Sequence, residues 1–164
     1  MAKTTLAHRQ SISILPAGSN ASDYRGDTLR FFPPTPNAPS PNHLFATTRG
    51  TNTSYKGFLS VFSVLSTGLL DTQESKIERW QTPTSGGGAN AIEMKAKLQE
   101  DASGDKSGTQ GAVWIALTDD ETGAGGVWIL EWDGEDTGGI RIVTEWSGEE
   151  DGSKVGASHA IWLD

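Results

Sequence analysis

The stretch HLFATTRGTNTSYKGFLSVFSV, from His43 to Val64, decides the fold. Leu44–Thr48 is rich in β-forming residues and ends at Arg49-Gly50, and a polar loop follows. From Gly57 to Val64, residues alternate between two faces with a period of two, which is typical of a strand with one buried side. The stretch therefore predicts two antiparallel strands with an arginine at their junction.

Arg49 is the candidate functional residue of this strand pair. An arginine at a strand end can hold a carboxylate through two parallel hydrogen bonds. A solvated surface charge is the ordinary alternative for an arginine in such a place. The spacing alone does not decide between the two.

Composition excludes several classes of protein. The 164 residues suffice for one modest core, and the absence of cysteine argues against a disulfide framework or a thiolate metal site. The three histidines, His8, His43 and His159, form no pair at ligand spacing, so we expect no metal. A net charge of −8 disfavours a nucleic-acid partner. Met1–Gln10 lacks the apolar segment of a signal peptide and no apolar run reaches membrane length, so we expect a soluble cytoplasmic protein that does not bind membranes.

Strand patterns recur along the rest of the chain. They cover Ser11–Leu15, Asp23–Phe32, Lys76–Gln81, Ala89–Met94, Ala112–Thr118, Gly126–Trp132, Gly139–Trp146 and Ala157–Leu163. Tyr24, Leu29 and Phe31 are candidate core residues of their strand. Residues 33–42, rich in proline, and residues 95–111, rich in Gly, Ser and Asp, are expected to be mobile loops, although the first eight residues of the second could also form a helix.

Internal repetition decides the architecture. ATTRG…KGFLSVF is echoed by LTDDE…GGVWILEW, and GANAIEM by GASHAIWL, at an offset of roughly 70 residues. The repeat predicts an all-β chain with two four-stranded antiparallel blades of a β-propeller, residues 23–81 and 89–146, a leading strand and a closing strand at 157–163. A β-sandwich is the alternative. Because two blades cannot close a ring, we expect an incomplete propeller.

Four motifs resemble a known family. LFATTRGTNTSYKGFLSVF, TPTSGGGANAI, ALTDDETGAGGVWILEW and the terminal HAIWLD occur in the same order in the carboxy-terminal part of the fungal carboxy-cis,cis-muconate cyclases, which are seven-bladed lactonase-like propellers. The resemblance runs from near Ile14 to Asp164. It implies that the chain corresponds to the last two blades and the closing strand of such a ring.

The resemblance also implies a reaction. Members of the family convert 3-carboxy-cis,cis-muconate to 3-carboxymuconolactone without a cofactor, in aromatic degradation through the β-ketoadipate pathway. A carboxylate of the substrate adds across a double bond of the same molecule while a proton reaches the neighbouring carbon. The protein must therefore neutralise a trianion, hold it curled and supply an acid.

The resemblance carries over to individual residues. Arg49 matches the family's active-site arginine, which implies that it faces the central channel and binds a substrate carboxylate. Arg25 also falls at a family arginine, where it would contact substrate or form an inter-strand ion pair. His159 stands where a member of the family has asparagine; substrate contact and a partly buried strand histidine are the two interpretations. Asp119 and Asp120 repeat a family acidic pair that either fixes a turn or acts in catalysis. The family's histidine, second arginine and glutamate lie on earlier blades, so we expect an incomplete active site.

Two other motifs have structural interpretations. Thr84–Asn90, TSGGGAN, is rich in glycine like a phosphate-binding loop, but no helix follows it, so we interpret it as a loop between blades. Trp80, Trp128, Trp132 and Trp146 recur at strand positions, which favours packing between sheets over a stacking platform for most of them.

Two other functions stay open. A non-enzymatic β-sheet module would use open blade edges to pair with another copy or with a complementary propeller fragment. A sugar-lactone hydrolase is the other, although the sequence offers neither an activated nucleophile nor a metal site for hydrolysis.

Overall fold

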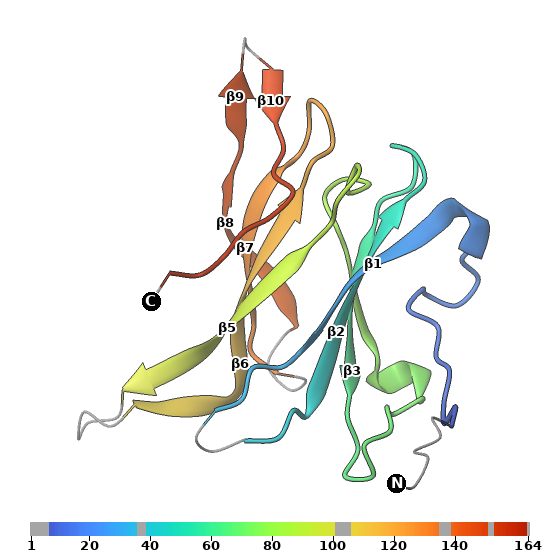
Figure 1. The fold of residues 1–164 in the computed structure, drawn as a ribbon, viewed down its shortest axis with the longest axis vertical. Coiled ribbons are helices and arrows are strands. Elements are labelled where there is room, and N and C mark those ends of the chain that lie inside the picture. Colours follow the sequence, from blue (N-terminus) through green and yellow to red (C-terminus); the bar gives the residue numbers. More distant parts are fainter. Residues whose placement is uncertain (1–6, 36–38, 101–105, 135–138, 151–152, 164) are drawn as a thin grey trace, which may run out of the picture.

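Two four-stranded antiparallel sheets form the body of the protein (Figure 1). The structure is a computed structural model that describes residues 7–35, 39–100, 106–134, 139–150 and 153–163. The helices in these ranges are the single 3₁₀ turns η1 (Ala21–Asp23) and η2 (Glu74–Lys76), and no helix there could cross a membrane. The predicted fold class, an all-β chain of two four-stranded units, is confirmed, and the arrangement is consistent with an incomplete propeller.

Each sheet is a simple meander in which strands that follow one another in sequence pair. The first contains β1 (Tyr24–Phe31), β2 (His43–Gly50), β3 (Phe58–Ser63) and β4 (Glu78–Gln81), in that order. The second contains β5 (Ile92–Glu100), β6 (Lys106–Asp119), β7 (Gly126–Trp132) and β8 (Ile140–Trp146). A small hairpin of β9 (Gly148–Glu150) and β10 (Ser153–Val155) follows.

The strand pair expected at the centre of the sequence is confirmed. β2 pairs with β3 so that Leu44 lies opposite Phe62 and Thr48 lies opposite Phe58. β2 also pairs with β1 on its other side, which makes it an inner strand with most of its residues buried. β2 is therefore held on both sides by backbone ladders as far as Thr48, and Arg49 next to it pairs with Arg25 of β1.

The main core lies between the two sheets. Its buried members are Phe32, Phe45, Leu59, Val61, Ile92, Val113, Ile115, Leu117, Trp128, Leu130, Trp132 and Ile140, with Trp80 and Met94 packed against them. Trp132 is fully buried: its ring meets the ring of Phe45 edge-on at 5.3 Å, and its Nε1 donates a hydrogen bond of 2.8 Å to Glu78 Oε2. The sheets are thus joined by aromatic packing and by polar contacts, which include the bond from Ile140 N to Glu78 Oε1 and the ion pair of Arg30 with Glu93.

The predicted leading strand, Ser11–Leu15, is wrong. This segment is extended but joins no ladder, because side chains rather than backbone groups hold it. Ile14 O accepts a hydrogen bond of 3.0 Å from Ser60 Oγ, and Gln10 Nε2 donates to Leu70 O at 2.7 Å. Ile12 and Ile14 pack on a second, smaller core on the face of the first sheet that turns away from the second sheet.

The predicted closing strand, Ala157–Leu163, is also wrong. The segment is irregular, and it is attached to the second sheet by isolated bonds such as the one from Trp162 Nε1 to Glu93 O, 3.2 Å long. Of the tryptophans expected to pack between the sheets, Trp146 is 61% exposed because β8 is an outer edge strand.

Where residues 95–111 are described they are strands rather than the predicted loop or its helical alternative, and their mobility stays a prediction. β5 runs on to Glu100 and β6 starts at Lys106, with these two residues paired, so the strands simply extend into a long hairpin. Residues 101–105 lie outside the described part. Loop 33–42 is irregular where described, 36–38 lie outside, and its mobility stays a prediction.

Two of the three candidate core residues of β1 are exposed. Leu29 is 60% exposed and Phe31 is 57% exposed, whereas Phe32, just beyond the strand, is buried. The physical reason is that β1 is an edge strand whose register shifts between Gly26 and Leu29, so its alternation does not carry through. Tyr24 is half-buried against other rings, as expected for a core contact.

Trp132 and Trp146 offer a matched test of where the core lies. We expect Trp132→Ala to lower the free energy of unfolding by about 3 to 5 kcal/mol, because it leaves a cavity and removes the donor to Glu78 Oε2. Trp146→Ala should change it by no more than about 0.5 kcal/mol, because that side chain is largely in water. Denaturant unfolding measures both, and equal losses for the two variants would contradict the assignment.

Candidate functional site

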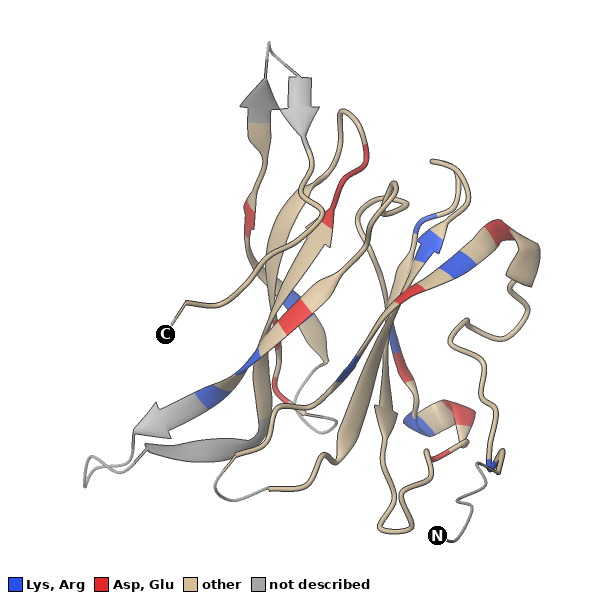
Figure 2. Ribbon diagram, viewed as in Figure 1, with Lys and Arg blue, Asp and Glu red and all other residues tan. Residues whose placement is uncertain are grey.

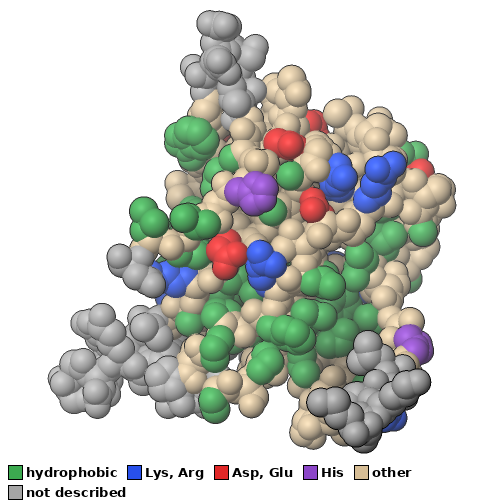
Figure 3. Space-filling model, viewed as in Figure 1, with side chains coloured by type: hydrophobic (Ala, Val, Ile, Leu, Met, Phe, Trp, Pro, Cys, Tyr) green, Lys and Arg blue, Asp and Glu red, His purple; other side chains and the backbone are tan. Residues whose placement is uncertain are grey.

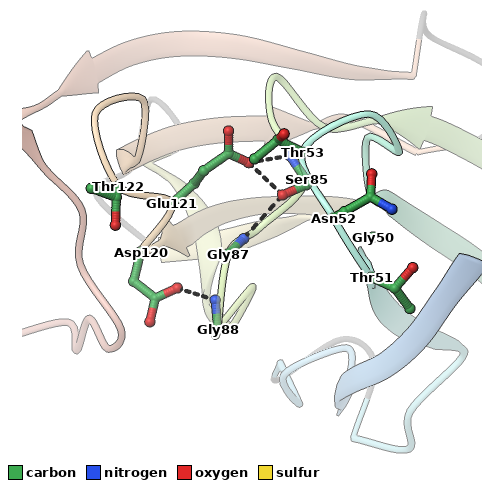
Figure 4. A pocket seen from close by; sticks show the side chains of 10 residues that line it. All are labelled: Gly50, Thr51, Asn52, Thr53, Ser85, Gly87, Gly88, Asp120, Glu121 and Thr122. Atoms are coloured by element: carbon green, nitrogen blue, oxygen red, sulfur yellow. Dashed lines mark hydrogen bonds between the residues drawn. The ribbon is translucent and has the colours of Figure 1, made fainter.

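The candidate site lies at one end of the sheets, where three connections meet beside a cavity of about 480 Å³. The connections are the segment after β2, the loop Thr84–Asn90 between β4 and β5, and the turn after β6 (Figure 4). The cavity is lined by Gly50, Thr51, Asn52, Thr53, Ser85, Gly87, Gly88, Asp120, Glu121 and Thr122. Its walls are therefore polar and include two carboxylates.

The loop Thr84–Asn90 joins the two sheets, so its interpretation as a connection between units is confirmed. Gly87 has φ +55°, and a Cβ there would lie 2.5 Å from Asp120 Oδ1, so a larger residue would be both strained and crowded. Gly88 N donates a hydrogen bond of 2.5 Å to the same carboxylate oxygen. The glycines thus let the backbone wrap closely around Asp120.

The acidic residues after β6 hold this loop in place. Asp119 accepts hydrogen bonds from Thr84 Oγ1 and, at 2.8 Å, from the backbone N–H of Glu121. Glu121 Oε2 accepts a bond of 2.9 Å from Ser85 N. The expectation that Asp119 and Asp120 fix backbone turns through hydrogen bonds is confirmed.

Asp119 is fully buried, and burial is the main cause that raises the pKa of its carboxyl above the ordinary value of 3.8. The charges of Glu121 and Asp120 raise the pKa further. The hydrogen bonds from Thr84 and from Glu121 N oppose the shift because they stabilise the ionised form. The net effect is a pKa above the ordinary value.

Arg49 lies beside the cavity without lining it, and its neighbours Gly50 and Gly87 form part of the wall. Arg49 Nη1 donates a hydrogen bond of 3.0 Å to Gly87 O, and its Nε is 3.9 Å from Asp27 Oδ2. The side chain is 27% exposed. The guanidinium is therefore held between the two sheets but is still reachable from solvent.

Arg25 is the cross-strand partner of Arg49 in the ladder between β1 and β2, so the two side chains emerge on one face. In the described part of the chain, Arg25 makes no side-chain hydrogen bond or ion pair, so the expected inter-strand ion pair is not seen there. Two guanidinium groups and the carboxylate of Asp27 leave one positive charge in excess. Figure 2 shows basic and acidic positions next to one another on β1 and near the end of β2, and Figure 3 shows such side chains together on the front surface.

His159 is exposed and outside any strand, so the partly buried strand histidine is wrong. Its Nδ1 lies 3.1 Å from Ser158 Oγ. The preceding backbone is bonded to the end of β6, where Ala157 N donates to Asp119 O at 2.9 Å. This places His159 at the same end of the second sheet as the cavity, but not in contact with Arg49.

Asp27 and Asn90 are site residues that the sequence reasoning missed. Asn90 is fully buried: its Nδ2 donates to Thr48 O at 2.8 Å, and its backbone N–H donates to Asp27 Oδ2 at 2.5 Å. Asp27 stands two residues after Arg25 on a strand, which was a usable signal for a shared face. Asn90 gave no such signal, because its partners are distant in sequence.

The arrangement suits recognition of an anion. Both arginines present cationic groups on one face, and the neighbouring acids are already engaged by backbone donors. No group of three or more His, Asp or Glu side chains in the described ranges is arranged to hold a metal ion.

The raised pKa of Asp119 makes stability depend on pH. Its protonated form contributes stability fully below the ordinary pKa of 3.8, and this contribution is lost as the pH rises through the higher pKa of the folded state. Since Asp119→Asn cannot ionise, we expect the free energy of unfolding of the unmodified chain to fall relative to this variant through that window and then to stay level. Urea unfolding over a pH series measures the difference.

Thr84→Val supplies the companion variant. It removes a hydrogen bond that lowers the pKa of Asp119. The loss of unfolding free energy with rising pH should therefore continue to a higher pH. If the free energy of unfolding of the unmodified chain rises with pH relative to that of Asp119→Asn, this account is contradicted.

Comparison with known proteins gives one informative similarity, and no family model matches the chain. The chain is 31% identical over 110 residues to muconate cycloisomerase 1 of Cutaneotrichosporon cutaneum. The match covers 67% of this chain and 25% of that protein, so the chain spans about a quarter of the length of its curated relative. The similarity supports a distant relationship to that cycloisomerase.

Proposed function

We propose that the chain belongs to a cofactor-independent lactonising enzyme of the cycloisomerase kind, acting on 3-carboxy-cis,cis-muconate in aromatic catabolism. The observation that carries the proposal is the arginine pair: Arg49 and Arg25 lie opposite each other in the ladder, and in the described part of the chain the carboxylate of Asp27 faces Arg49 alone, so the pair keeps a positive charge in excess. The distant similarity to a muconate cycloisomerase supports the same substrate class, a polycarboxylate. The chain itself contributes one part of such a site.

In the proposed reaction one carboxylate oxygen of the substrate forms a C–O bond to an alkene carbon, and a proton adds to the neighbouring carbon. Nothing leaves, so the reaction is an isomerisation. Arg49 binds and neutralises a substrate carboxylate, and Arg25 offers a second cation for another carboxylate of the same trianion. His159 is proposed as an outer contact at the same end of the second sheet.

The acidic wall of the cavity determines from which side the trianionic substrate approaches. Asp120 and Glu121 line it, and like charges would repel a trianion there, although backbone N–H groups partly offset them. We therefore place the carboxylates on the side of Arg25 and Arg49, with the cavity next to them.

The proposal is tested by following the ultraviolet absorbance of 3-carboxy-cis,cis-muconate with the purified chain. Because the chain supplies only part of the site, we expect slow consumption of the substrate. We expect its loss in Arg49→Ala and only partial retention in Arg49→Lys, because lysine keeps the charge but not the planar fork. Arg9→Ala is the matched control, since Arg9 is exposed and makes no side-chain contact in the described part of the chain. Equal activity of Arg49→Ala and Arg9→Ala would overturn the role of Arg49.

A second candidate function is a β-sheet module that pairs with another copy of the chain. The observation that favours it is the outer strand β8, where Ile142, Val143 and Trp146 are all exposed. Light scattering after size-exclusion chromatography should then show a dimer that Val143→Lys dissociates. A monomer at all concentrations would rule the module out.

A further inference from the structure

Asp27 is the acidic side chain that faces Arg49. Its Oδ2 is 3.9 Å from Arg49 Nε and accepts a hydrogen bond of 2.5 Å from Asn90 N. The carboxylate is 23% exposed, so it is only partly screened by water. One oxygen atom therefore contacts the loop between the sheets and lies next to the guanidinium.

The backbone of β1 explains why Asp27 is aimed this way. The register between β1 and β2 shifts between Gly26 and Leu29, which takes Asp27 out of the regular ladder. In the same stretch Thr28 N donates to a side chain, Thr47 Oγ1 at 3.0 Å, instead of to a strand carbonyl. Asp27 lies two residues after Arg25, so strand alternation places it on the face that Arg25 and Arg49 share, and the irregularity lies at that point of β1.

Two nitrogen atoms of the Arg49 guanidinium, Nη1 and Nε, face protein groups in the described part of the chain, and the third, Nη2, does not. Nη1 is bonded to Gly87 O, and Nε faces Asp27 but is buried without a hydrogen-bond partner. Nη2 makes no hydrogen bond with the described residues. A guanidinium held on two sides in this way presents its remaining donors outward in a fixed plane.

We propose that Asp27 is a positioning residue for Arg49: it fixes the plane of the guanidinium so that an incoming carboxylate meets the Nη2 end. Through Asn90 N, the same carboxylate ties the arginine to the loop Thr84–Asn90, whose Gly87 carbonyl holds Nη1. This inference rests on the proposed function, in which Arg49 binds a substrate carboxylate. It adds a residue to the site that neither the sequence patterns nor the similarity assigns.

The test compares Asp27→Asn with the unmodified chain. Asparagine keeps an oxygen for Asn90 N and loses the charge that faces Nε. Three quantities are measured: the ¹H–¹⁵N resonance of Arg49 Nε, assigned by its absence in Arg49→Lys; the affinity for propane-1,2,3-tricarboxylate as a probe; and kcat and KM for 3-carboxy-cis,cis-muconate.

We expect the Nε resonance to move and kcat to fall by about 10-fold to 100-fold, because misplacing a binding group by about 1 Å costs rates of that order. The affinity for the tricarboxylate should stay the same or rise, and KM should not increase, because the site gains one unit of positive charge. A merely structural role would instead weaken binding and turnover together. Asp27→Glu, which restores the charge, should recover part of kcat.

Asp23→Asn is the control, since it makes the same change of charge nearby and Asp23 has no side-chain contact with Arg49 in the described ranges. An unchanged Nε resonance in Asp27→Asn would overturn the proposal, as would equal effects of Asp23→Asn. If the unmodified chain neither turns over the substrate nor binds the tricarboxylate, but the Nε resonance still moves in Asp27→Asn, the proposed function fails while the positioning of Arg49 by Asp27 stands.

Discussion

Burial of the facing sides of two β-sheets is the interaction on which the rest of the structure depends. Each sheet is a meander whose facing side is apolar, and neither of these sides is covered until the other sheet packs on it. Trp132 illustrates the join, because its ring fills the space beside Phe45 while its Nε1 reaches Glu78 of the opposite sheet. Once the sheets are packed, the ends of β2 and β6 and the loop between the sheets have to meet.

The charges at that meeting point are unevenly balanced, and this gives the site its chemistry. Asp119, Asp120 and Glu121 are engaged in holding the loop between the sheets, so their charges serve local structure. Arg25 and Arg49 are cross-strand neighbours, and the carboxylate of Asp27 faces Arg49. An excess cation on a partly exposed face favours an anionic ligand, because a like-charged pair gains from a counter-ion.

Local patterns predicted the strands that form ladders and failed where other forces hold the chain. Leu44–Thr48 and Gly57–Val64 alternate clearly, and both lie in the predicted strand pair. Ser11–Leu15 alternates too, yet it is held by Gln10 and Ser60 side chains and joins no ladder. Residues 95–100 lack a strand pattern, but pairing with β6 extends β5 through them. For the site, the sequence pointed to Arg49 and Arg25, whereas Asp27 and Asn90 emerged from contacts between segments more than forty residues apart.

The sequence by itself determined the all-β class, the two four-stranded units and the inner strand that ends in Arg49, because a period of two and turn residues act over short distances. Only the tertiary structure decided which strand faces are buried, that Leu29 and Phe31 lie in water, and that Asp27 turns toward Arg49. Those outcomes depend on a register shift in an edge strand and on the packing of one sheet against the other. Such effects arise from contacts that no local pattern of residues encodes.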